Sequence, residues 1–165
     1  MNKITKSGST FCLDNFPWEK EFPARPETRV TISWNEIGLL VHFVSFETNL
    51  RAVETEHNTP VCQDSCMEFF FAPMGDGRYF NAELNPNGCM RLGYHGTGMT
   101  LLLTPKDMAD FAITPQRTED GWQLEYRIPF SFIRIFFPDF RAESGAEMRA
   151  NFYKCGDKTV TPHYL

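Results

Sequence analysis

The stretch that decides the fold is DSCMEFFFAPMGDGRYFNAELNPNG, residues 64–88. Apolar and polar side chains alternate over residues 66–71 and again over residues 79–84, and a period of two is typical of strands with one buried face. The second run stops at Asn-Pro-Asn-Gly, residues 85–88, which favours a tight turn. The sequence therefore predicts two neighbouring strands that share one apolar face and one polar face.

The same alternation recurs on both sides of this stretch. Further strands are predicted at residues 30–34, 39–46, 90–94, 101–103, 111–114, 122–128 and 148–153. Residues 130–137 favour a short helical or irregular segment, because Pro129 ends the strand before them. With 16 Phe to fill the space between layers, the pattern predicts an all-β fold. We expect a two-sheet antiparallel β-sandwich of the immunoglobulin or jelly-roll kind, with short irregular or helical insertions.

Two longer segments lack this alternation. Residues 13–27 are rich in proline and charge and predict an irregular lead-in, whose Phe16, Trp18 and Phe22 pack against the body. Residues 47–63 predict a long loop that lines a binding site. A chain of 165 residues can bury one core of ordinary size, so we expect one domain over residues 1–165.

The charge of the chain narrows the class of partner. Its formal net charge is -5 and no stretch concentrates Lys or Arg, so we expect neither nucleic acid nor membrane lipid as a partner. No run of 18 apolar residues occurs, and residues 1–16 lack the apolar core of an export signal. These features predict a cytoplasmic protein, or an exported one whose leader has been removed. Nothing in the sequence predicts the oligomeric state.

Five cysteines, an odd number, are scattered along the chain. They are Cys12, Cys62, Cys66, Cys89 and Cys155. Their spacing lacks the two close pairs of a structural zinc site, which favours free thiols and no metal site. The alternative is a zinc site made of His57, Cys62 and Cys66.

The common catalytic motifs are absent. The sequence contains no GxSxG elbow, no phosphate-binding glycine pattern and no HExxH helix. Glycoside hydrolysis needs two carboxylates on either side of a sugar bond, and Glu68, Glu83 and Glu125 are strand carboxylates that could oppose one another. Because solvated strand faces carry such residues routinely, we expect a protein without catalytic residues and keep glycosidase activity as an alternative.

The polar faces of the predicted strands carry a particular mixture of side chains. They are Glu68, Asn81, Glu83, Arg149, Asn151 and Tyr153. A sugar hydroxyl both donates and accepts a hydrogen bond, and the C–H face of a sugar packs against aromatic rings. Carboxylate, amide, guanidinium and phenol groups together therefore favour carbohydrate binding.

Four motifs follow one another between residues 30 and 153: DSCMEFFFAP, YFNAELNPNG, GWQLEYRIPFSFI and MRANFYK. In this order they resemble the family 9 carbohydrate-binding modules and their DOMON-like relatives. The resemblance implies a β-sandwich that binds a sugar or oligosaccharide without cleaving it. Several such modules are attached to glycan-degrading enzymes, so it also implies a link to carbohydrate catabolism.

The resemblance also implies a set of site residues. Glu68 matches the carboxylate that bonds sugar hydroxyls, Asn81 stands where the family has a basic residue, and Tyr153 stands where it has a glutamine. Cys62 stands where the family has the first of two Trp plates that stack on the sugar. We expect the ligand over Glu68, Asn81 and Tyr153, with Asn151 and the loop around Cys62 beside it.

The second Trp of the family and its neighbouring Asn would follow Leu165. Either the domain is truncated at its C-terminus or the pocket is open.

No cofactor is expected from the local sequence. The resemblance implies that calcium is a candidate, because some family members hold it through loop oxygens, for which Asp76, Asp107 and Asp110 are available. A related sandwich family binds haem through Met and His. That alternative function, a redox or haem module, would use Met67, Met90 and His95.

Overall fold

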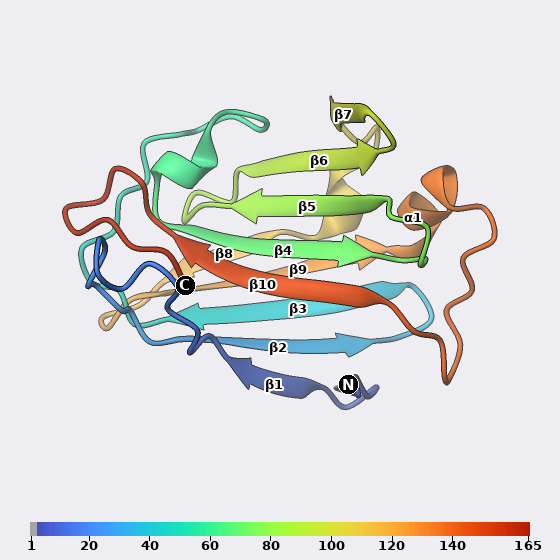
Figure 1. Cartoon of the computed structure of the whole chain (residues 1–165), viewed down its shortest axis with the longest axis horizontal. Helices are drawn as coiled ribbons and strands as arrows, with labels where there is room; N and C mark the ends of the chain where they lie inside the picture. Colours follow the sequence, from blue (N-terminus) through green and yellow to red (C-terminus); the bar gives the residue numbers. More distant parts are fainter. Residues whose placement is uncertain (1–2) are drawn as a thin grey trace.

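The computed structural model describes residues 3–165 and shows two antiparallel sheets of five strands each, packed face to face (Figure 1). The strands of sheet A are β1 (Ser9–Cys12), β2 (Thr28–Trp34), β3 (Gly38–Ser45), β8 (Thr114–Arg117) and β9 (Trp122–Pro129), in the order β1-β2-β3-β9-β8. The strands of sheet B are β4 (Cys66–Ala72), β5 (Tyr79–Leu84), β6 (Met90–Gly96), β7 (Met99–Leu102) and β10 (Arg149–Cys155), in the order β10-β4-β5-β6-β7. The predicted all-β sandwich is confirmed.

The apolar residues that alternate along the strands fill the space between the two sheets. Phe69 and Phe71 on β4 and Phe80 on β5 are fully buried there, opposite Phe43 and Trp122 of sheet A. Helix α1 (Phe130–Phe136) closes one end of this core. The insertion predicted at residues 130–137 is therefore a short helix.

The structure differs from the prediction mainly in three strands. Strand β1 was not predicted, because its four residues, Ser9–Cys12, form an edge strand with little alternation. The strand predicted at residues 111–114 is wrong: the 3-10 turn η2 (Met108–Phe111) ends there, Ala112 has a left-handed backbone with φ of 47°, and β8 begins at Thr114. Strand β6 continues through Gly93 to Gly96.

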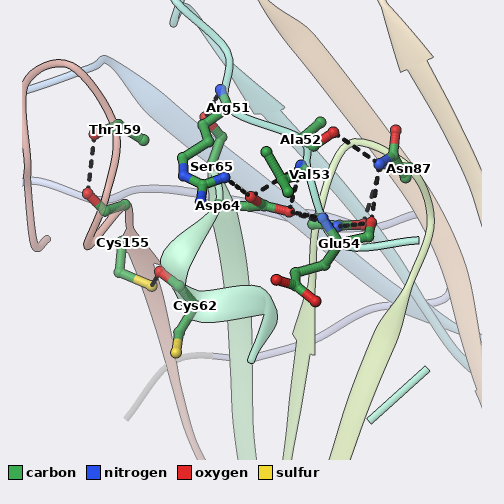
Figure 2. A network of polar contacts seen from close by, with 12 residues as sticks. Arg51, Ala52, Val53, Glu54, Cys62, Asp64, Ser65, Asn87, Cys155 and Thr159 are labelled. Carbon is green, nitrogen blue, oxygen red and sulfur yellow. Dashed lines mark hydrogen bonds and ion pairs between the residues drawn. The ribbon is translucent and has the colours of Figure 1, made fainter. Parts of the chain in front are cut away.

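The loop over residues 47–63 is fastened to sheet B by the buried carboxylate of Asp64 (Figure 2). This carboxylate accepts hydrogen bonds from the Arg51 guanidinium at 2.9 Å and from the backbone N–H groups of Val53 and Glu54 at 3.0 and 2.9 Å. The side-chain amide of Asn85 donates a further bond at 2.9 Å. The aspartate of the Asp-Ser-x-x-Glu motif therefore shapes the loop beside the sheet.

The chain after β10 folds back along the free edge of that strand. Leu165 exchanges two backbone hydrogen bonds with Lys154, at 2.8 and 3.2 Å. The Lys154 side chain is fully buried, and its Nζ lies 2.9 Å from the Glu47 carboxylate and 2.7 Å from Nε2 of His163. One buried ion pair thus joins the start of the 47–63 loop, β10 and the last residues.

No helix in the described part of the chain, residues 3–165, is long and apolar enough to cross a bilayer.

Candidate functional site

The outer face of sheet B carries the polar residues singled out in the sequence. The strand register places Tyr153 of β10 opposite Glu68 of β4, and Glu68 opposite Glu83 of β5. Residues directly opposite each other in antiparallel strands share one face, with Cβ atoms about 4.5–5.5 Å apart. The next row along the sheet holds Asn151, Phe70 and Asn81. No segment of backbone crosses in front of the middle of β4 and β5 in this outer face (Figure 1).

Two carboxyl groups lie side by side in the first row. Oε1 of Glu68 accepts a hydrogen bond from the Cys155 thiol at 2.8 Å, and burial raises the pKa of Glu68. Burial, and after it the negative charge of Glu68, raise the pKa of Glu83 to about 7. Near neutral pH the Glu83 carboxyl group can therefore donate as well as accept a hydrogen bond.

Asn81 holds a chain of hydrogen bonds across three strands. Its Nδ2 donates to Oε1 of Glu83 at 2.6 Å, and its Oδ1 accepts from Nε2 of His95 at 2.9 Å. Nδ1 of His95 then accepts from the Thr100 hydroxyl at 3.2 Å, and burial lowers the pKa of His95. Because Asn81 is only 8% exposed, it orients Glu83 and His95 rather than forming the surface itself.

A row of rings crosses the same face. Tyr153 meets Phe70 edge-on at 5.3 Å, Phe70 lies 6.2 Å from Tyr79, and Tyr79 stacks on His95 at 4.4 Å. All four residues are half-buried, so each presents part of its ring to solvent. Such rings are the kind of surface on which the C–H groups of a sugar pack.

Cys62 lies at one end of the face, in the 3-10 turn η1 (Val61–Gln63). Its carbonyl oxygen lies 3.8 Å from Sγ of Cys155, which points toward it (Figure 2). Burial raises the pKa of the Cys62 thiol to about 12, with a further contribution from Asp157. Tyr164 packs beside these thiols.

Aromatic residues therefore lie near Cys62, although the family's tryptophan is missing there. Tyr164 contacts Phe22 at 4.6 Å and Trp18 at 6.1 Å, both from the lead-in segment. These two contacts agree with the expectation that the lead-in packs on the body. Tyr164 reaches this place only because the chain folds back after β10, which no local pattern in the sequence indicates.

Two hollows lie in the surface, one away from this face and one at its edge. One, of about 390 Å³, lies between Trp34, Phe130 and residues 142–148. The other, of about 380 Å³, lies between β1 and β10 and is bordered by Asn151 and Tyr153. Glu68 and Asn81 line neither of them. The candidate site is therefore an open surface rather than a deep pocket.

Comparison with known proteins assigns the family. The sequence profile of carbohydrate-binding family 9 matches residues 3–165. This chain belongs to carbohydrate-binding family 9. The family consists of non-catalytic modules that bind carbohydrate, which agrees with the open polar face of sheet B.

Solved structures support the assignment of this family 9 module. A "putative carbohydrate-binding protein" from Bacteroides uniformis ATCC 8492 is 30% identical with a TM-score of 0.80, over 96% of this chain and 76% of that one. A family 9 module from Caldicellulosiruptor kristjanssonii, solved with cellotriose, shares the fold at 14% identity and a TM-score of 0.57, over 86% of this chain and 66% of that one. The glucose complex of a family 9 module from the same organism is 13% identical with a TM-score of 0.59, over 85% of this chain and 64% of that one. No curated protein sequence matches the chain.

In the family 9 module, residues that haem binding or glycoside hydrolysis would bring together lie on different faces or sheets. Met67 and Met90 are buried between the sheets, whereas His95 lies on the outer face, so the three cannot share one haem. Glu125 is exposed on β9, which belongs to the other sheet from Glu68.

The metal candidates from the sequence do not assemble. Among residues 3–165, the only place where the ligand atoms of three or more His, Cys, Asp or Glu residues converge is Cys66, Glu68 and Cys155. His57 is not part of it; its Nδ1 accepts a hydrogen bond from the backbone of Met90. The aspartates considered for calcium, Asp76, Asp107 and Asp110, form no such group either.

Proposed function

We propose that this module binds a saccharide on the outer face of sheet B, in direct contact with Glu68 and Tyr153. The observation that carries the proposal is their register: the two residues lie opposite each other, on the one face where carboxylate, amide and phenol groups gather. Asn151 lies in the next row and extends the contact. Asn81 acts as a positioning residue that orients Glu83, and the loop around Cys62 borders the ligand.

The chemistry of this face suits sugar hydroxyls. The carboxyl oxygens of Glu68 accept hydrogen bonds, and the carboxyl of Glu83, with a pKa of about 7, can also donate one. The phenol of Tyr153 does both. The rings of Phe70 and Tyr79 provide apolar surface in place of the missing tryptophan plates. The Caldicellulosiruptor module was solved with glucose and with cellotriose, so glucose and its β-linked oligomers are the first ligands to test.

We also propose that binding is not followed by hydrolysis, and that the module serves glycan recognition in carbohydrate catabolism. A glycosidase places its two carboxylates on either side of the sugar bond. Glu68 and Glu83 instead project side by side from adjacent strands, where both meet the ligand from the same side. Incubation with nitrophenyl glycosides should release no nitrophenol. Turnover that disappears in Glu68→Gln would overturn this part of the proposal.

Calorimetric titration and glycan-array binding test the proposed site. Tyr153→Ala should weaken binding about fivefold, because one aromatic contact contributes about 1 kcal/mol. Glu68→Gln should weaken it about tenfold or more, since a hydrogen bond to a charged group contributes about 1.5–3 kcal/mol. Glu125→Gln, on the opposite sheet, is the matched control and should bind as the wild type does. Absence of binding to all sugars, or an equal loss in the control, would refute the proposal.

A further inference from the structure

Two thiols and a carboxylate converge at the end of sheet B that η1 covers. Cys66 of β4 and Cys155 of β10 are cross-strand partners, and Glu68 follows two residues along β4 on the same face. The two sulfur atoms and a carboxylate oxygen of Glu68 all lie within 4.8 Å of one another. Three side chains from two strands are thus held together by the register of the sheet.

The distances are close to those of a metal site. Zinc binds thiolate sulfur at about 2.3 Å and carboxylate oxygen at about 2.0–2.2 Å, so ligand atoms in a tetrahedral site lie about 3.5–3.8 Å apart. Drawing the group together requires shifts of about 1 Å at most, which side-chain rotation supplies. The three ligands leave a fourth position for a water molecule.

The surroundings favour a cation at this position. Glu83 lies opposite Glu68 in the strand register and adds a second carboxyl group beside the site. The Lys154 ammonium is engaged by Glu47 at 2.9 Å, on the opposite face of β10. A divalent cation would displace the thiol protons and balance carboxylates that now share a half-buried position.

We propose that Cys66, Glu68 and Cys155 form a binding site for a thiophilic divalent cation of the zinc type. Two sulfur ligands and one oxygen select zinc over calcium or magnesium, which require mostly oxygen ligands. Glu68 is partly exposed and gives the ion a route from solvent to the buried thiols. The site departs from the expectation that the chain binds no metal, and it does not depend on sugar binding.

The wild-type protein provides the first test, in a reducing buffer without sugar and after removal of metal with a chelator. Zinc, titrated in competition with a chromophoric chelator, should bind one ion per chain at this site. Added zinc should raise the thermal unfolding midpoint, because an ion that binds the folded state stabilises it by mass action. Cobalt should give thiolate-to-metal charge-transfer absorption, which oxygen ligands alone do not produce. An unchanged midpoint together with a cobalt spectrum lacking that absorption would overturn the proposal.

Variants locate the site. Cys66→Ser and Cys155→Ser should each weaken zinc binding by at least about tenfold and remove the cobalt absorption. Cys12→Ser and Cys89→Ser are the matched controls: Cys12 is exposed on β1, and Cys89 lies in the same apolar cluster outside the group of ligands. Both controls should bind zinc as the wild type does. Equal losses in Cys89→Ser or Cys12→Ser would place the metal elsewhere and overturn the proposal.

Discussion

Gly93 leaves the space that the side chain of Asn81 occupies. A Cβ atom at Gly93 would lie 2.1 Å from Oδ1 of Asn81 and 3.1 Å from Nε2 of His95. The two residues are cross-strand partners on β5 and β6. A glycine inside a strand costs stability, but here it admits the hydrogen-bonded amide that orients Glu83.

Gly93→Ala should therefore displace Asn81 and break its bonds to Glu83 and His95. We expect a loss of about 1–3 kcal/mol in the free energy of unfolding, the usual cost of overpacking, together with weaker saccharide binding. Chemical denaturation and calorimetric titration measure the two effects. The control is Gly75→Ala, because no atom lies within 4 Å of the Cβ that this change adds. Equal stability of the two variants would contradict the prediction.

The raised pKa of Glu83 should make stability depend on pH. The pKa rises from 4.5 to about 7 on folding, so between these values the folded state binds more protons than the unfolded state. The contribution of Glu83 to the free energy of unfolding is then fully present below pH 4.5. It is lost as the pH rises through 7, and the loss is about 3 kcal/mol at most. Denaturation midpoints measured across this range should decline less steeply in Glu83→Gln. Glu125→Gln should show the same change of midpoint with pH as the wild type. If Glu83→Gln shows that same change, Glu83 is not the group responsible for the pH dependence.

Asp64 should contribute more to stability than any exposed aspartate. Asp64→Asn places an amide NH₂ group against backbone N–H groups and the Arg51 guanidinium, so we expect a loss of about 3 kcal/mol or more. The control is Asp76→Asn. Asp76 forms a solvent-exposed ion pair with Arg78, so this change should alter the free energy of unfolding little. Denaturation by urea compares the two. If they prove equally stable, the network around Asp64 does not hold the loop.

Replacing Lys154 should leave the buried Glu47 carboxylate without its ammonium partner, although the Ser65 hydroxyl and the Trp122 indole still donate hydrogen bonds to it. Lys154→Met is expected to lose about 3–5 kcal/mol of unfolding free energy, and adding Glu47→Gln should recover part of it. A double-mutant cycle measured by denaturation gives the coupling between the two residues. Lys6→Met disrupts an exposed ion pair with Glu36 and should leave stability unchanged. A coupling near zero would mean that the buried pair contributes nothing.

Much of the fold could be predicted because its pattern is local. The period of two along β4 places Phe69 and Phe71 in the core and Glu68 outside, without knowledge of any partner strand. The elements that were missed or misplaced, β1 and β8, are edge strands of four residues each. So short a run holds too few alternations to distinguish a strand from a loop.

The site could be predicted only in part. Alternation indicated that Glu68 and Tyr153 point outward, and the family resemblance selected them. Their position opposite each other depends on the pairing of β4 with β10, strands far apart in the sequence. The convergence of Cys155 with Cys66 depends on the same pairing. Register between distant strands is a property of the whole sandwich, so single-strand patterns do not contain it.

The return of the chain to Lys154 also affects how the module meets other copies of itself. A sheet edge with unpaired N–H and C=O groups is a template on which another chain can add a strand. Leu165 fills this edge at Lys154, and the exposed Arg149 places a charge at the other end of β10. The end of the β10 edge near Lys154 is therefore already paired and cannot accept another strand.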